Sequence, residues 1–160
     1  MSLKVIPNFL RNANKIVALA NEHHDLFVPR TGEDAHAGFI PGICSRFKTL
    51  KNESMPQELV TAIFADADWD EDTRDFWEFI QIQKYEPGDY IVPHRDSYRV
   101  RKLHLIILTS GKYDGLVSEN ENKELIFIPD EAGQYVDFPY TAAHYVSPVR
   151  ELRYTLVMGI

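Results

Sequence analysis

Histidines and aspartates are the residues of this chain whose types and spacing best suit chemistry. The chain has six histidines, and the pattern His-x-Asp occurs twice, as His23-His24-Asp25 and as His94-Arg95-Asp96. Two imidazoles and one carboxylate can hold Fe(II) on one face and leave the other positions open for substrate and O2. Ligands at i and i+2 suit a strand, where both side chains point the same way. Six histidines and twelve aspartates in 160 residues make a chance pair common, so the context must decide.

The two pairs lie in different contexts. His23–Asp25 comes at the predicted end of a helix, where a histidine interacts favourably with the helix dipole, and we expect no metal there. His94–Asp96 follows a predicted strand and the turn Pro87-Gly88. Its third ligand must come from elsewhere in the sheet, and His144, which lies 48 residues after Asp96, precedes another short apolar run.

A second acidic pattern suggests calcium at first sight. Four aspartates alternate from Asp66 to Asp72. A calcium loop that starts at Asp66 needs Gly at its sixth position and Glu at its twelfth, but the chain has Glu71 and Trp77 there. We therefore interpret this segment as a solvated acidic turn between a helix and the sheet.

The elements that must position these residues change character along the chain. The first half has helical patterns: Asn12 is expected to cap a helix that ends near His23–Asp25, and Ser54-Met55-Pro56-Gln57 is a capping-box pattern for a second helix. Residues 29–45 are rich in Gly, Pro and charge and are predicted to be loop or short strand.

The second half has the pattern of short strands separated by turn residues. The predicted strands are Phe76–Tyr85, Leu103–Thr109, Leu125–Ile128, Tyr135–Phe138 and Leu152–Met158. We expect residues 110–124 to be a solvated, mobile loop that, with residues 29–55, covers the mouth of a metal site. Helices first and strands afterwards predict helices packed on one face of an antiparallel sandwich or barrel.

Composition narrows the class of protein. Lys and Arg number 17 and Asp and Glu 24, which gives a net charge of −7 and disfavours nucleic acid and anionic membranes as partners. The single cysteine, Cys44, excludes an intrachain disulfide and fits a reducing cytosol. Without a long apolar run or a signal-peptide pattern, we expect a soluble, cytoplasmic, single-domain protein.

From Gln81 to the C-terminus the chain resembles the 2-oxoglutarate- and Fe(II)-dependent dioxygenases, with the closest likeness to the prolyl-4-hydroxylase-like branch. The matching residues are Tyr85, Pro87-Gly88, His94-x-Asp96, Leu103–Thr109, Phe138-Pro139, His144, Val146, Pro148-Val149 and Arg153, and Ile6-Pro7-Asn8-Phe9-Leu10 resembles the start of that branch. The resemblance implies a double-stranded β-helix core (a jelly roll, cupin-like) in one oxygenase domain over residues 1–160, with 1–75 as mostly helical support and 76–160 as the core.

The resemblance also implies roles for particular residues. His94, Asp96 and His144 would be the catalytic Fe(II) ligands. Arg153, nine residues after His144, would bind the distal (C5) carboxylate of 2-oxoglutarate, which needs a cation when buried. Thr155 lies on the same strand face as Arg153 and would add a hydroxyl to the same carboxylate, while Tyr85 would hydrogen-bond the co-substrate.

Several neighbouring residues carry separate expectations. Gln81 and Gln83 share the strand face of Tyr85, and either line the pocket or lie on a solvated face. The branch often has a second tyrosine on the strand after His-x-Asp, whereas this chain has Leu105-Ile106-Ile107-Leu108, which predicts an apolar wall. Three further expectations concern residues outside the site: His104 is expected in the core, Arg95 should point away from the metal, and Trp69 and Trp77 should be packing residues.

The function that the resemblance implies is hydroxylation of a C–H bond with release of succinate and CO2, with a prolyl residue of a peptide or protein as the expected substrate. Fe(II), 2-oxoglutarate and O2 would be required, and ascorbate is a possible further cofactor. A free amino acid or other small molecule is the alternative substrate, and a non-catalytic cupin-like binding protein is the alternative class. The nucleic-acid demethylases have a second arginine six residues after the first, but this chain has Gly159 there. The sequence does not indicate the oligomeric state.

Overall fold

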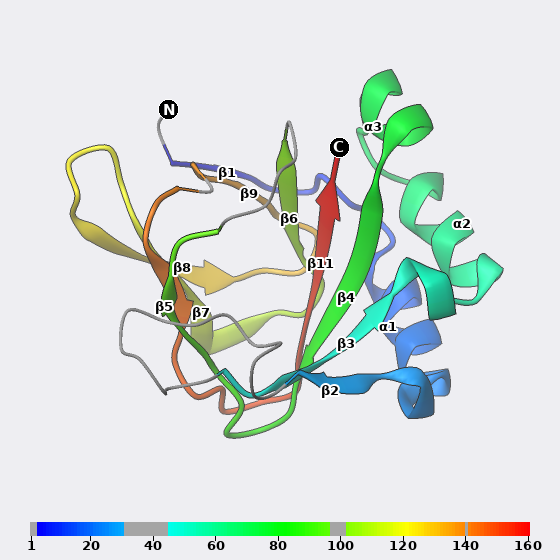
Figure 1. The fold of residues 1–160 in the computed structure, drawn as a ribbon, viewed down its shortest axis with the longest axis horizontal. Helices are drawn as coiled ribbons and strands as arrows, with labels where there is room; N and C mark the ends of the chain where they lie inside the picture. Colours follow the sequence, from blue (N-terminus) through cyan, green and yellow to red (C-terminus); the bar gives the residue numbers. More distant parts are fainter. Residues whose placement is uncertain (1–2, 31–44, 97–101, 140) are drawn as a thin grey trace.

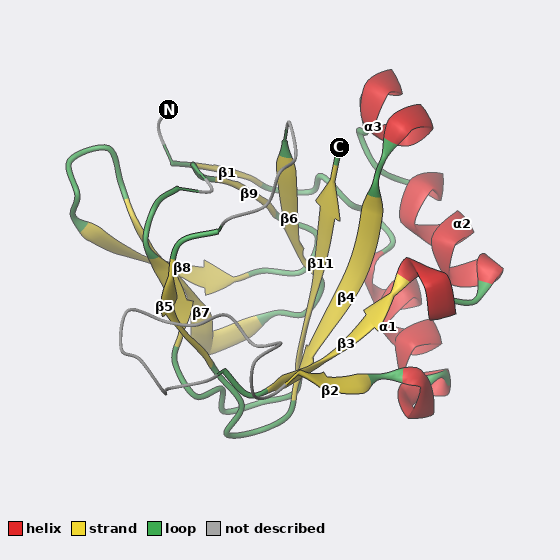
Figure 2. Cartoon of the chain, in the orientation of Figure 1, coloured by secondary structure: helices red, strands yellow, loops and turns green. Residues whose placement is uncertain are grey.

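Two antiparallel β-sheets and a layer of helices make up the chain in the computed structural model, which describes residues 3–30, 45–96, 102–139 and 141–160. The larger sheet has seven strands in the order β1-β9-β6-β11-β4-β3-β2, and the smaller has four in the order β5-β10-β7-β8. The helices cover the outer face of the larger sheet (Figures 1 and 2). This arrangement confirms the expected jelly-roll core.

The elements have the following bounds. The strands are β1 Lys4–Ile6, β2 Val28–Arg30, β3 Phe47–Lys51, β4 Phe79–Tyr85, β5 Ile91–His94, β6 Leu103–Ile107, β7 Gly111–Glu119, β8 Leu125–Asp130, β9 Tyr135–Asp137, β10 His144–Val146 and β11 Arg153–Gly159. The α-helices are α1 Ala13–Glu22, α2 Gln57–Ala65 and α3 Glu71–Phe76, with short 3-10 helices at His24–Leu26 and Asn52–Ser54.

Alternation along the central strand β11 separates two cores. Tyr154, Leu156 and Met158 pack with the helices in one apolar cluster. Val157 belongs to a second cluster between the sheets. Because successive side chains of a strand point to opposite faces, Arg153 and Thr155 also point between the sheets, where they line a cavity.

The helix starts differ from their predicted capping. The helix α1 begins after Asn12 as expected, but the Asn12 side chain makes no cap and donates instead from Nδ2 to the carbonyl of Ala62 in α2, at 2.8 Å. The predicted capping box is wrong, because Ser54 lies in a 3-10 turn and α2 starts only after Pro56, with no side-chain cap. The proline fixes the local backbone for helix entry without a capping hydroxyl.

The acidic segment after α2 is ordered by its own side chains and is not simply a solvated turn. Asp70 caps α3, accepting a hydrogen bond from the Thr73 backbone N–H at 2.7 Å. Hydrogen bonding from the Thr73 side chain, and then from its backbone, lowers the pKa of Asp70. Arg11 pairs with both Asp66 and Asp68. The strand predicted from Phe76 therefore begins only at Phe79, after this short helix.

The loop expected over residues 110–124 is also wrong, because most of it is the nine-residue strand β7, which pairs with β8 and β10. Its charged residues are partnered within the fold. Asp114 is buried and accepts the backbone N–H groups of Arg150 and Glu151, and Glu119 pairs with Arg95. Only the turn from Asn120 to Glu124 connects β7 to β8.

The structure describes part of the segment expected to cover the metal site, and it places both tryptophans. Residues 45–55 contain β3 and a 3-10 turn, while Cys44 and the rest of the expected cover over 31–44 lie outside the described residues. Trp69 is buried and donates to the Ile63 carbonyl, and Trp77 stacks on Phe64, which confirms that both are packing residues. Within the described residues, no helix has the length and apolar character needed to cross a membrane.

His104 is a core histidine, as expected. It is buried between β6 and the helices, with Nδ1 2.7 Å from the Tyr135 hydroxyl and Nε2 3.1 Å from Thr73 Oγ1. Burial, with a smaller contribution from Lys102, lowers the pKa of His104 from 6.5 to about 4, while Asp70 opposes the shift. The imidazole is therefore neutral in the folded protein at neutral pH.

This histidine predicts a loss of stability in mild acid. Between pH 6.5 and about 4 the unfolded chain binds a proton at His104 that the folded chain does not, so the free energy of unfolding falls as the pH falls. The contribution is on the order of 2–3 kcal/mol across that window. Urea unfolding at pH 7.5 and pH 5 measures it, and His104→Gln should be less sensitive to this change. An equal pH dependence in the two proteins would contradict the assignment.

Candidate active site

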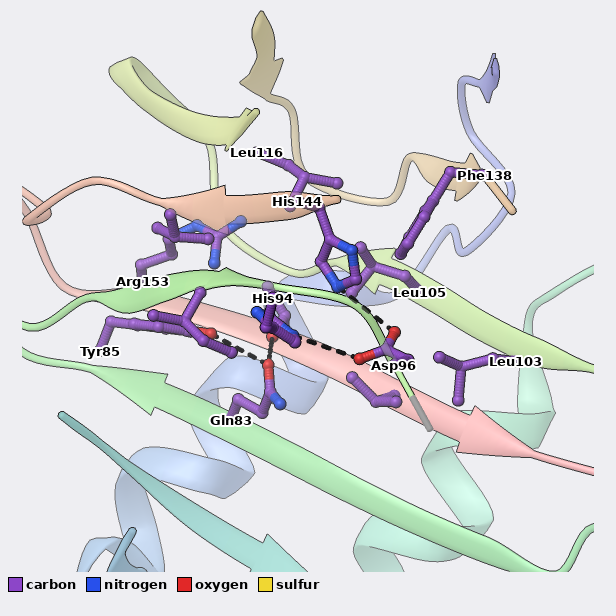
Figure 3. Close-up of a pocket in the computed structure, with 14 residues that line it drawn as sticks. Gln83, Tyr85, His94, Asp96, Leu103, Leu105, Leu116, Phe138, His144 and Arg153 are labelled. Atoms are coloured by element: carbon purple, nitrogen blue, oxygen red, sulfur yellow. Dashed lines mark hydrogen bonds and ion pairs between the residues drawn. The ribbon is translucent and has the colours of Figure 1, made fainter. Parts of the chain in front are cut away.

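Pairing of β5 with β10 brings the predicted metal ligands together. His94 ends β5, His144 begins β10, and the two residues are direct partners in the antiparallel register. Asp96 follows β5 by two residues, and its oxygens lie 3.2 Å from His94 Nε2 and 3.3 Å from His144 Nε2. Figure 3 shows the three side chains converging. All three are buried, and they form a group whose geometry could hold a metal ion.

The second nitrogen of each imidazole is fixed by the backbone. His94 Nδ1 lies 2.7 Å from the carbonyl of Val92, and His144 Nδ1 lies 2.8 Å from the carbonyl of Ala142. A carbonyl can only accept, so each Nδ1 must carry a proton. Each Nε2 faces a carboxylate oxygen of Asp96 and is the nitrogen that would present its lone pair to a metal ion bound in place of its proton. Metal-ligating histidines are oriented in this way by second-shell acceptors. Two neutral imidazoles and one carboxylate are therefore a donor set that fits a divalent cation such as Fe(II).

Asp96 is held as a carboxylate. Burial acts to raise its pKa, but hydrogen bonds and charge from His144 and His94 together lower the pKa well below the usual value.

The other His-x-Asp pattern of the sequence lies on the surface and not in a buried group. His23 lies at the end of α1 and contacts Glu58 at 3.0 Å on an exposed surface. Exposed acidic groups of this kind are common without a metal, so we assign no metal to His23.

Arg153 lies deeper between the sheets and has a carboxylate partner that sequence reasoning missed. Its Nε is 2.7 Å from Asp130 Oδ2 and its Nη2 is 3.1 Å from Asp130 Oδ1. The guanidinium also lies over the ring of Tyr85, 4.9 Å from its centroid. The sequence did not indicate Asp130, because Pro129-Asp130 has the pattern of a turn. A buried arginine needs a counterion, so the expected burial of Arg153 was the one signal that pointed to an acidic partner.

The polar face of β4 is organised by Gln83. Its Oε1 accepts hydrogen bonds from the Tyr85 hydroxyl at 3.1 Å and from Thr155 Oγ1 at 3.0 Å. Gln83 therefore lines the cavity (Figure 3). Gln81, two residues earlier on the same face, does not line this cavity; it is buried, and its Nε2 has no hydrogen-bond partner among the described residues.

One cavity joins the metal-binding group to the arginine. It encloses about 470 Å³ including its opening to solvent. The residues that line it are Gln83, Tyr85, Ile91, His94, Asp96, Leu103, Leu105, Leu116, Phe138, His144, Val146, Arg153, Thr155 and Val157. Leu105 on β6 gives the apolar wall that the sequence predicts in place of a second tyrosine. Arg95 points outward to Glu119 and to the carbonyl of Thr141, as expected.

Comparisons with known proteins identify the fold. No family model matches the sequence, and no curated protein matches it. Among solved structures, a prolyl-4-hydroxylase from Pseudomonas putida is 17% identical with a TM-score of 0.65, over 99% of this chain and 91% of that one. A Trichoplax adhaerens prolyl hydroxylase in complex with a hypoxia inducible factor peptide fragment is 12% identical with a TM-score of 0.70, over 99% and 82%.

A third similar structure is that of an enzyme named for a different reaction. The non-heme alpha-ketoglutarate-dependent carbocyclase SnoK from nogalamycin biosynthesis is 11% identical with a TM-score of 0.67, over 98% of this chain and 78% of that one. At these identities the likeness establishes the fold. The chain therefore has the double-stranded β-helix fold that is also found in 2-oxoglutarate- and Fe(II)-dependent oxygenases.

Proposed function

We propose that this protein is a 2-oxoglutarate- and Fe(II)-dependent oxygenase that hydroxylates a C–H bond of a prolyl residue in a peptide or protein. The observation that carries the proposal is the buried group of His94, Asp96 and His144, which opens into the same cavity as the buried cation Arg153. A jelly roll that only binds a ligand has no need of both features in one cavity.

His94, Asp96 and His144 would hold the iron through Nε2, carboxylate and Nε2. When bound, Fe(II) supplies the open coordination positions at which O2 can be activated. The protein holds the three ligand atoms in place, because the Val92 and Ala142 carbonyls fix the imidazole planes. The apolar residues of the cavity, such as Leu105 and Phe138, exclude water from the reacting groups.

The co-substrate would lie between the metal and Arg153. Its 2-oxo acid end suits the metal, and its distal carboxylate suits a guanidinium that is already buried. Gln83 holds the hydroxyls of Tyr85 and Thr155 beside this path. The dependence of the similar carbocyclase on alpha-ketoglutarate supports this choice of co-substrate.

A peptide substrate is favoured by the sequence resemblance to the prolyl-hydroxylase branch and by the similar structure that holds a peptide. A small-molecule substrate is the second candidate, favoured by the similar carbocyclase from nogalamycin biosynthesis. A screen of proline-containing peptides, free amino acids and other small molecules distinguishes the two. The readouts are succinate release and a product one oxygen atom heavier.

Metal binding is the first test of the site. Mn(II) serves as a substitute for Fe(II) that is not readily oxidised. His94→Ala, Asp96→Ala and His144→Ala should each weaken Mn(II) binding by more than about 100-fold. Each substitution removes a direct ligand, which costs more affinity than the loss of an outer-shell partner does. Calorimetry measures the affinity, and His23→Ala, at the exposed site, is the control that should bind as the unmodified protein does. Unchanged affinity in any of the three variants would remove that residue from the ligand set.

Activity is the second test. With Fe(II), 2-oxoglutarate and O2, the unmodified protein should release succinate in the presence of a proline-containing peptide, and His94→Ala or His144→Ala should abolish this release. Arg153→Leu should raise the KM for 2-oxoglutarate by about 100-fold, because a buried charge-assisted pair would be lost. Succinate formation that persists in either histidine variant would refute the proposed metal centre.

The two glutamines of β4 form a matched pair for a stability test. Gln83→Leu should destabilise the fold by about 1–3 kcal/mol, because it leaves two buried hydroxyls without their acceptor. Gln81→Leu should be neutral or stabilising, because it removes a buried amide nitrogen that has no partner within the described part of the chain. Urea unfolding measures both, and equal losses would show that Gln83 is not the organising acceptor.

A further inference from the structure

Asp130 and Arg153 form an ion pair that is almost fully buried. Arg153 is 2% exposed and Asp130 is 6% exposed. The carboxylate meets the side edge of the guanidinium, through Nε and one Nη2 proton. A guanidinium has five N–H donors, so its end edge, formed by Nη1 and the other Nη2 proton, remains suited to a second carboxylate. The two edges can therefore be occupied at the same time.

The charge around the pair is already negative without a ligand. Asp114 is also buried, is held by two backbone N–H groups, and acts electrostatically on both Arg153 and Asp130. Burial raises the pKa of Asp130, while Arg153 opposes the rise. One cation thus faces two carboxylates, so the distal carboxylate of a co-substrate would be the third anion at this end of the cavity.

We propose that Asp130 is a positioning and specificity residue that lowers the affinity of Arg153 for the distal carboxylate of 2-oxoglutarate and of succinate. This inference rests on the proposed function. Asp130 joins the end of β8 in one sheet to β11 in the other, and it neutralises Arg153 while the cavity contains no dicarboxylate. The same negative charge opposes the incoming dicarboxylate and favours release of the dicarboxylate product.

This role differs from a merely structural one in a measurable way. A carboxylate that only held Arg153 in place would, on removal, reduce both stability and ligand affinity. A carboxylate that competes for the cation would, on removal, reduce the stability of the ligand-free protein but increase its affinity for dicarboxylates. The sign of the change in affinity therefore decides between the two.

The test is calorimetric titration of the Mn(II)-loaded protein. Asp130→Asn should lower the Tm of the ligand-free protein and should lower the Kd for 2-oxoglutarate and for succinate by about tenfold, as expected for removing one nearby buried charge. Binding of 2-oxopentanoate, which has the same chain length and no distal carboxylate, should be unchanged. Asp89→Asn is the matched control, because Asp89 is a buried aspartate paired with Arg46 outside the cavity.

Each result bears on the inference. A folded Asp130→Asn protein that binds 2-oxoglutarate as weakly as, or more weakly than, the unmodified protein overturns it, and so does equal tightening in Asp89→Asn. If Asp130→Asn does not fold, Asp114→Asn decides, since it removes the second charge and leaves the ion pair: about threefold tighter binding supports the inference, and no change overturns it. If the unmodified protein binds no 2-oxoglutarate, the proposed function fails first.

Discussion

The antiparallel pairing of β5 with β10, in the register that sets His94 opposite His144, is the interaction on which the site depends. Directly opposite residues of an antiparallel pair point to the same face, so both imidazoles enter the space between the sheets. Asp96 follows at i+2 and reaches both Nε2 atoms. A shift of one residue in this register would turn one histidine outward and disperse the group. The site is therefore a direct consequence of strand pairing.

The larger sheet allows this interior to be polar. Its outer face packs against α1 and α2 in an apolar cluster with Tyr154 and Leu156, which supplies burial without using the inner face. The inner face can then carry Gln83, Thr155 and Arg153, each with a hydrogen-bond partner. Buried polar groups are tolerable when they are paired in this way. The division of the sheet into two faces thus separates stability from chemistry.

Much of this arrangement could be predicted from sequence, because it follows from local alternation and short motifs. Arg153 and Thr155 share a face by strand periodicity, and Pro87-Gly88 before His94 indicates a turn into a strand. Asp130 could not be predicted, since its partner lies 23 residues away in the other sheet. The strand β7 was not predicted, because its charged residues are typical of a loop and are paired only in the folded chain. Asp114, for example, accepts the backbone N–H of Arg150. Long-range partners carry no local pattern.

The absorption spectrum of the protein with Fe(II) and 2-oxoglutarate under anaerobic conditions tests the central claim most directly. A 2-oxo acid that chelates Fe(II) in this site gives a visible metal-to-ligand charge-transfer band, which neither component gives alone. The structure predicts this band for the unmodified protein and its loss in His144→Ala. No band in the unmodified protein, or an unchanged band in His144→Ala, would contradict a metal centre formed by His94, Asp96 and His144.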